Sequence, residues 1–239
     1  MTRLARNRNT HLTSAEIAAA ALRCFDEGSS PPSIRQLATL LGTSSSAIYY
    51  HVSSRAEIVR AVVDLVWEEV TVEFLSLLTD RPGADPRDTM VKAGLATRRV
   101  FARHYRVAPF ITATPDMTRF APATIALMGD LLGALGLSPE EAASAFHAYA
   151  SFTIGSVVFS ALRRITNEEF ADVRDAQAPD EGQPPDEMRR QLAAVVSVST
   201  DDPGRDEALF LDGLTRLVST FVPGMAAATT DGTRSELAP

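Results

Sequence analysis

Apolar residues recur along most of the chain at the three- and four-residue spacings of amphipathic helices, and no stretch alternates with the two-residue period of a strand. Four of these patterns follow a Ser or Thr with Glu or Gln three positions later, which is typical of a capping box, at residues 13, 33, 54 and 138. Asp85-Pro86 marks a fifth start, because proline is tolerated at the first helical position. The pattern predicts an all-α protein with helices at 13–27, 33–41, 45–52, 54–79, 85–105, 107–113, 119–135, 138–165, 186–198 and 205–222.

The expected helices fall into a short group and a long group. Three short, closely linked helices precede a long fourth one, so we expect an N-terminal three-helix domain at 1–53 and a larger helical domain at 54–222. Residues 170–187 are acidic and rich in proline, and 223–239 are small and polar, so both are expected to lack fixed structure, the second as a disordered tail.

The second and third short helices are joined by a turn that contains Gly42, just past a helix end, where a left-handed conformation costs glycine little. Helix, tight glycine-containing turn and helix is the arrangement that presents its second helix to the major groove of DNA. In the third helix Ile48 and Val52 lie four residues apart and are expected to face the core. The pattern predicts a helix-turn-helix DNA-binding domain.

The residues expected to contact DNA lie in this turn, in the third helix and at the starts of its neighbours. Small side chains at the start of the third helix allow a close approach to base edges, and Ala47 can meet a thymine methyl. One serine of 44–46 is expected to cap the helix and another to reach DNA, and for Arg35 a phosphate contact and a merely solvated position stay equally open. The three rings at 49–51 could also be packing residues. The full set is Ser33, Arg35, Thr43, Ser44, Ser45, Ser46, Ala47, Tyr49, Tyr50, His51 and Arg55.

Charge separates the two expected domains. The net charge is −7, but residues 1–60 hold seven Arg against four acidic residues, about +3, which leaves −10 for the remainder. A basic head suits a polyanion, and an acidic body would be repelled by it. The single cysteine, Cys24, permits no internal disulfide, and no apolar run approaches the roughly 20 residues of a membrane span. We expect a cytoplasmic protein with no metal, no cofactor and no membrane partner.

The body carries scattered aromatic, methionine and histidine side chains that could line a largely apolar ligand pocket. Each of them alone is more often a core residue than a ligand contact. His104, Tyr105 and His147 are the expected polar groups, and neither histidine has a second ligand at a spacing that fixes a metal site. The sequence contains no serine-hydrolase elbow, dinucleotide-binding, P-loop or zinc-protease motif, so the chain is expected not to be an enzyme. The pocket candidates are Trp67, Phe101, His104, Tyr105, Phe110, Met117, Phe120, Met128, His147 and Phe152.

Residues 13–65 resemble the N-terminal domain of the TetR (tetracycline repressor) family, without a gap. The resemblance is carried by AALRCFDEG, a first helix ending in Phe and Gly, and by SIRQLATLLGTSSSAIYYHVSSRAEIVRAVVD. Two positions depart from that family's pattern, because Thr43 stands where Val is usual and Arg55 where Lys is usual. Arginine keeps the positive charge of the position, so a phosphate contact remains available there.

The resemblance implies an all-helical protein whose C-terminal domain both dimerises and binds a small effector, with 138–165 and 205–222 as the candidate dimer helices. It also implies a transcription regulator, most often a repressor, that binds a palindromic DNA operator as a homodimer. Release would follow the binding of a small, largely apolar molecule such as an antibiotic or secondary metabolite. The alternative is a helical small-molecule or lipid carrier that keeps a vestigial N-terminal DNA-binding fold.

Overall fold

The computed structural model describes residues 12–28, 31–80, 82–111, 122–169 and 203–224, and within these ranges it contains helices and no strand. The predicted all-α class is therefore confirmed for the described part of the chain. The predicted helix at 186–198, the proline-rich stretch 170–187 and nearly all of the predicted tail lie outside it. The elements are α1 (Ser14–Glu27), α2 (Ile34–Leu40), α3 (Ser45–His51), α4 (Arg55–Asp80), α5 (Pro86–Arg103), the 3-10 turn η1 (Ala108–Phe110), α7 (Pro122–Ala134), α8 (Pro139–Glu169) and α11 (Pro203–Ser219).

Side chains close the first turns of several helices as the sequence predicts. Glu16 N–H donates to Thr13 Oγ1 (3.1 Å), and Thr13 N–H donates back to the Glu16 carboxylate (2.9 Å). The same reciprocal pair closes α2 at Ser33 and closes α8 at Ser138. At α5 the Asp85 carboxylate caps a helix that begins with proline. Each cap satisfies N–H groups that the helix itself leaves without a partner.

The predicted capping box at the start of α4 is wrong in one half. Glu57 N–H does donate to Ser54 Oγ (3.2 Å). The Glu57 carboxylate, however, reaches one residue further back and accepts from both the N–H (2.6 Å) and the hydroxyl (2.7 Å) of Ser53. Two donors on one residue outweigh the single N–H of Ser54, and these bonds hold the pKa of Glu57 below its usual range.

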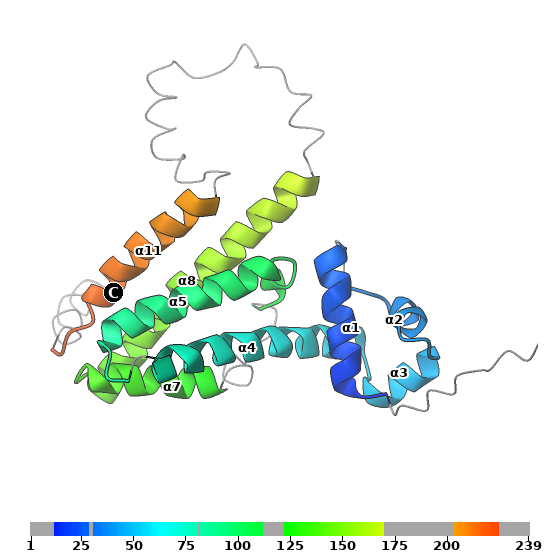
Figure 1. Ribbon diagram of the computed structural model, residues 1–239, viewed down its shortest axis with the longest axis horizontal. Coiled ribbons are helices and arrows are strands. Elements are labelled where there is room, and N and C mark those ends of the chain that lie inside the picture. Colours follow the sequence, from blue (N-terminus) through cyan, green and yellow to red (C-terminus); the bar gives the residue numbers. More distant parts are fainter. Residues whose placement is uncertain (1–11, 29–30, 81, 112–121, 170–202, 225–239) are drawn as a thin grey trace, which may run out of the picture.

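Helix α4 links the N-terminal helices to the rest of the molecule. In Figure 1 it runs from the group formed by α1, α2 and α3 to α7, and it also packs against α5. One hydrophobic cluster contains buried residues from the three N-terminal helices, such as Ile17 and Ile48. The same cluster includes Val62 of α4, Phe101 of α5 and Ile111, which follows η1. The N-terminal helices therefore share a continuous core with the body across the expected boundary at 53 and 54, whose assignment as a domain boundary stays a prediction.

A second hydrophobic cluster fills the far end of the body. It is built around Phe74 of α4, Met90 of α5, Leu132 of α7, Tyr149 of α8 and Leu214 of α11. Helix α5 packs against α4, α7, α8 and α11, so it forms the centre of this bundle.

Helix α8 keeps an apolar face on the outside of the bundle. Although no uninterrupted apolar run in the sequence reaches the length of a membrane span, α8 is by length and mean hydropathy long and apolar enough to cross a membrane, and only 28% of that apolar window is buried. Its contacts with α5, α7 and α11 cover the inner face. The exposed residues Ser151, Gly155, Phe159 and Leu162 follow one another at helical spacing along the outer face, and the Phe159 side chain is 63% exposed.

Candidate functional site

The turn between α2 and α3 is held by backbone hydrogen bonds and one left-handed glycine. Leu41 N–H donates to Leu37 O (2.9 Å). Thr43 N–H then donates to Ala38 O (2.9 Å). Between these two bonds Gly42 has a φ of 64°, a conformation that strains residues with a Cβ. The turn thereby fixes the direction in which α3 leaves α2.

Helix α3 is anchored by its first residue and its inner face. The Ser44 hydroxyl accepts a hydrogen bond from Ala47 N–H (3.1 Å) and caps the helix. Ile48 and Val52 are buried in the core between α1, α2 and α4, as the sequence predicts. A helix of seven residues has little stability of its own, so this burial is what holds it rigid.

The outer face of α3 presents aromatic and small polar side chains. Tyr49 is 57% exposed and Tyr50 is 86% exposed, while the Tyr50 ring meets the half-buried His51 edge-on, with centroids 5.2 Å apart. Large aromatic side chains with this exposure cannot contribute much to the core, and they remain available to a partner. Of the other predicted contacts in this segment, Ser44 and Ser46 are exposed and Thr43, Ser45 and Ala47 are half-buried.

The predicted DNA contacts that flank α3 and its turn are exposed, and two of them also make hydrogen bonds within the protein. The Ser33 hydroxyl accepts from Gln36 N–H (3.2 Å) in the α2 cap, whereas Arg35 extends from α2 into solvent. The Arg55 guanidinium donates to the Pro31 carbonyl oxygen, which ties the start of α4 to the loop before α2. No local pattern predicts this bond, because it joins residues 24 positions apart. Arg55 nevertheless retains its charge and further N–H groups at the surface.

A largely apolar cavity lies within the body, between α4, α5, α7 and α8. Its empty volume is about 560 Å³, which includes space at its open mouth. Binding sites for small organic molecules are typically concave and lined mainly by apolar side chains. The lining residues are Trp67, Phe74, Ala93, Thr97, Thr124, Ile125, Met128, Phe146, Tyr149, Ala150, Thr153 and Ile154, none of which is charged.

Most polar atoms around the cavity are already hydrogen-bonded within the protein. Tyr149 O–H donates to Met90 O (2.9 Å), and burial raises the pKa of this phenol. The Thr97 hydroxyl donates to Ala93 O (2.9 Å), and the Thr124 hydroxyl pairs with a threonine of α4 at 2.9 Å. These groups therefore contribute shape to the cavity and leave it apolar.

Two buried polar atoms on lining residues have no hydrogen-bond partner among the described residues. They are the indole nitrogen Nε1 of Trp67 and the hydroxyl oxygen of Thr153. Burial raises the pKa of Tyr149 and the nearby Thr153 hydroxyl opposes that rise, but the two hydroxyl groups do not reach hydrogen-bond geometry. A buried donor without a partner is rare in folded proteins, because it has lost water and gained nothing in return.

Solved structures share this arrangement of an N-terminal helix-turn-helix and a helical body. A TetR transcriptional regulator from Streptomyces coelicolor matches with a TM-score of 0.64 at 24% identity, covering 88% of this chain and 97% of its own. ActR from the same organism, in complex with actinorhodin, matches with a TM-score of 0.65 at 23% identity, covering 91% and 99%. TetR from Acinetobacter baumannii AYE matches with a TM-score of 0.61 at 21% identity, covering 88% and 96%.

The chain has the TetR fold. The resemblance predicted from residues 13–65 is thereby confirmed and extends over most of the sequence. An HTH-type transcriptional regulator from Saccharopolyspora erythraea is 28% identical over 168 residues, which is 70% of this chain and 68% of that protein. No family model matches the chain.

The TetR fold divides the ten predicted pocket residues among several environments. Trp67 and Met128 line the cavity. Phe101 lies against Trp67, edge to face at 5.2 Å, and Phe152 stacks on Phe210 at 5.6 Å. The remaining described candidates are not among the lining residues. Phe110 packs on Phe25, His147 is exposed, and His104 and Tyr105 belong to ionic clusters. Met117 and Phe120 lie outside the described residues.

Sequence reasoning missed all the lining residues that α8 contributes. Phe146, Tyr149, Ala150, Thr153 and Ile154 all face the cavity. Their spacing of three, four, seven and eight residues is that of one helix face, so the periodicity could have grouped them. Sequence alone could not show whether that face meets a cavity or a filled core.

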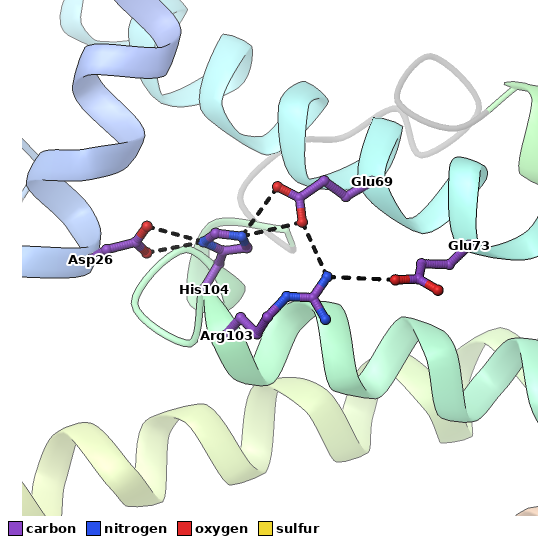
Figure 2. Close-up of polar contacts among 5 residues, drawn as sticks. All are labelled: Asp26, Glu69, Glu73, Arg103 and His104. Carbon is purple, nitrogen blue, oxygen red and sulfur yellow. Dashed lines mark hydrogen bonds and ion pairs between the residues drawn. The ribbon is translucent and has the colours of Figure 1, made fainter.

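His104 connects the N-terminal helices of the TetR fold to its body (Figure 2). It ends α5, its side chain is only 13% exposed, and its Nδ1 lies 3.0 Å from the Asp26 carboxylate of α1. Its Nε2 lies 3.3 Å from the Glu69 carboxylate of α4, which also pairs with Arg103 at 3.2 Å. The imidazole thus bridges three helices. Among the described residues no cluster of His, Cys, Asp or Glu side chains is arranged to hold a metal ion.

Tyr105 belongs to a separate cluster at the end of α8. Its hydroxyl donates to the Glu168 carboxylate (2.8 Å), which also accepts from Arg106 (2.7 Å) and Arg164 (3.1 Å). The Arg164 guanidinium lies 3.8 Å from the centroid of the Tyr105 ring. Burial raises the pKa of Glu168, but these hydrogen bonds and charges outweigh it and leave the pKa below its usual range. The cluster ties the loop after α5 to α8.

Proposed function

We propose that this protein is a transcription regulator that binds DNA through α3 and responds to a small molecule bound in the body. The observation that carries the proposal is α3 itself, whose inner face is buried while Tyr49 and Tyr50 stand exposed on the outer face. An exposed, rigid short helix after a glycine turn matches the groove-reading helix of a helix-turn-helix. The basic balance of residues 1–60 supplies attraction to phosphates.

The active form proposed is a homodimer that represses transcription from a palindromic operator. Two copies would place their α3 helices in successive major grooves, about 34–36 Å apart. The exposed Phe159 and Leu162 of α8, with Leu209 on the adjacent α11, supply an apolar face that a second copy would cover. Gly155 on the same face permits close approach of the partner helix. Sedimentation of a Phe159→Asp variant as a monomer would support this interface, and an unchanged dimer would contradict it.

The response to an effector is proposed to pass through α4. This helix lines the cavity with Trp67 and Phe74, and its first half packs Ile58 and Val62 into the core of the DNA-reading head. A ligand that binds best when α4 is displaced would change the distance between the two N-terminal domains of a dimer. Their α3 helices would then no longer match the spacing of successive major grooves. By linkage, DNA and effector must then weaken each other's binding by the same factor. Solved structures of the same fold bind small molecules, including actinorhodin in ActR and minocycline in a TetR variant.

The test of DNA binding is fluorescence anisotropy with the DNA that flanks the protein's own gene. Tyr50→Ala is expected to weaken operator binding by about tenfold or more, since truncated aromatic contacts typically cost over 1 kcal/mol. Val72→Ala is the control, because Val72 is also exposed, on α4, but lies away from α3. An unchanged affinity for Tyr50→Ala would remove α3 as the reading helix.

A salt titration tests the phosphate contact proposed for Arg55. Arg55→Ala is expected to weaken binding to all DNA sequences and to reduce the slope of log K against log salt by about 1. Arg55→Lys keeps the charge and should keep the slope, even though it loses the bond to Pro31. A slope in Arg55→Ala equal to that of the wild type would contradict the contact. If the protein were instead a small-molecule carrier with a vestigial N-terminal DNA-binding fold, it would bind ligand but show no operator binding in either assay.

A further inference from the structure

The chemistry of the cavity restricts which ligands it can hold. All twelve lining residues in the described part of the chain are uncharged, so a ligand charge buried there would have no counter-charge among them. Four of the twelve are aromatic, with Trp67 and Phe74 on α4 and Phe146 and Tyr149 on α8. Aromatic walls favour a flat aromatic ligand through stacked and edge-on contacts.

Two of the lining residues carry a buried polar atom that has no hydrogen-bond partner among the described residues. The residues that carry them, Trp67 and Thr153, are 5% and 2% exposed, and neither Trp67 Nε1 nor the Thr153 hydroxyl has a partner among the described residues. Indole N–H is only a donor, so the atom that could satisfy it must be an acceptor. The other lining threonines and Tyr149 already use their hydroxyl groups within the protein.

We propose that the cavity takes a neutral, flat aromatic ligand bearing a carbonyl oxygen, and that Trp67 Nε1 and the Thr153 hydroxyl donate hydrogen bonds to that oxygen. The inference rests on the proposed function, since it assigns the chemistry of the effector to the same cavity. Trp67 and Thr153 are then the residues that set ligand preference, whereas the remaining lining supplies shape and apolar contact.

Three naphthalene compounds of similar size separate the effect of a carbonyl acceptor on affinity from the effect of a ligand charge. 1-Acetonaphthone is neutral and carries a carbonyl, 1-ethylnaphthalene is neutral without an acceptor, and 1-naphthoate carries acceptors and a negative charge. Calorimetric titration of the full-length protein is expected to give tightest binding for the ketone, at least about tenfold tighter than the hydrocarbon. The naphthoate is expected to bind most weakly. Trp67 is the single tryptophan of the chain, so its fluorescence reports binding at this site alone.

Variants at two threonines test the assignment of the donor. Thr153→Val is expected to lose about tenfold in affinity for the ketone and little for the hydrocarbon. Thr97→Val is the matched control, because Thr97 also lines the cavity but its hydroxyl already donates to Ala93 O (2.9 Å). Trp67→Phe should likewise reduce the preference for the ketone while circular dichroism shows the native helix content. Equal losses in Thr97→Val and Thr153→Val would overturn the assignment.

The outcomes distinguish this inference from the proposed function. Equal binding of ketone and hydrocarbon, tightest binding of the naphthoate, or binding of none of the three compounds would overturn the inference about ligand chemistry. DNA binding is judged separately by the Tyr50→Ala assay. A compound that binds the cavity without weakening operator binding would instead contradict the proposed effector response, while leaving the ligand chemistry supported.

Discussion

At Gly94 helix α5 lies close to side chains of two other helices, and replacing this glycine by alanine should destabilise the protein. A Cβ at this position would lie 3.0 Å from the Tyr149 hydroxyl oxygen and nearer still to Leu214 Cδ2. Tyr149 is held by its bond to Met90 O and Leu214 is fully buried, so neither can move aside freely. Overpacking of this kind typically costs about 1–3 kcal/mol.

The gain in helix propensity must be separated from that cost. Gly129 lies inside α7, and a Cβ there would meet nothing within 4 Å, so Gly129→Ala reports the propensity term, a gain of up to about 1 kcal/mol. Urea unfolding followed by circular dichroism at one fixed protein concentration compares the two variants. Gly94→Ala should be less stable than Gly129→Ala by about 1–3 kcal/mol. Equal free energies of unfolding would refute the close approach of α5 to α11 and α8.

Three further changes test other parts of the structure. In a double-mutant cycle of Asp26→Asn and His104→Gln, the free energies of unfolding should be non-additive by about 0.5–1 kcal/mol, and additivity would show that the bridge contributes nothing. Glu168 has a lowered pKa, so its stabilising contribution is present above its ordinary value of 4.5 and is lost as pH falls through the folded-state pKa. Tyr105→Phe removes a hydrogen bond that lowers this pKa, so acid unfolding should begin at higher pH, and an unchanged acid limb would contradict that role. Ser44→Ala removes the cap of α3 and should cost about 1 kcal/mol of stability while leaving the salt dependence of DNA binding unchanged.

Interactions within a few residues of one another were predictable from sequence. The caps of α1, α2, α5 and α8 depend on side chains two or three positions from the N–H group they satisfy. The inward direction of Ile48 and Val52 depends on their spacing along one short helix. One local interaction was predicted wrongly, because the Glu57 carboxylate accepts its hydrogen bonds from Ser53 and not from the N–H of Ser54.

The roles of side chains in the body depended on distant partners. His104 and Tyr105 were polar groups expected in a pocket, but they pair with carboxylates 78 and 63 residues away, at Asp26 and Glu168. Charge and hydrogen-bonding capacity are visible in a sequence, whereas the identity of the partner is not. Trp67 lines the cavity while Phe101 packs behind it, a distinction between two aromatic residues that no local pattern encodes.

The sequence by itself determined the all-helical class, the helix-turn-helix and the helix start signals, because these follow from the period of a helix and from contacts within a turn. Only the tertiary structure decided where the cavity lies and which polar atoms around it are unpaired. That outcome depends on how the faces of α4, α5, α7 and α8 converge, and side chains far apart in the chain settle which atoms are satisfied.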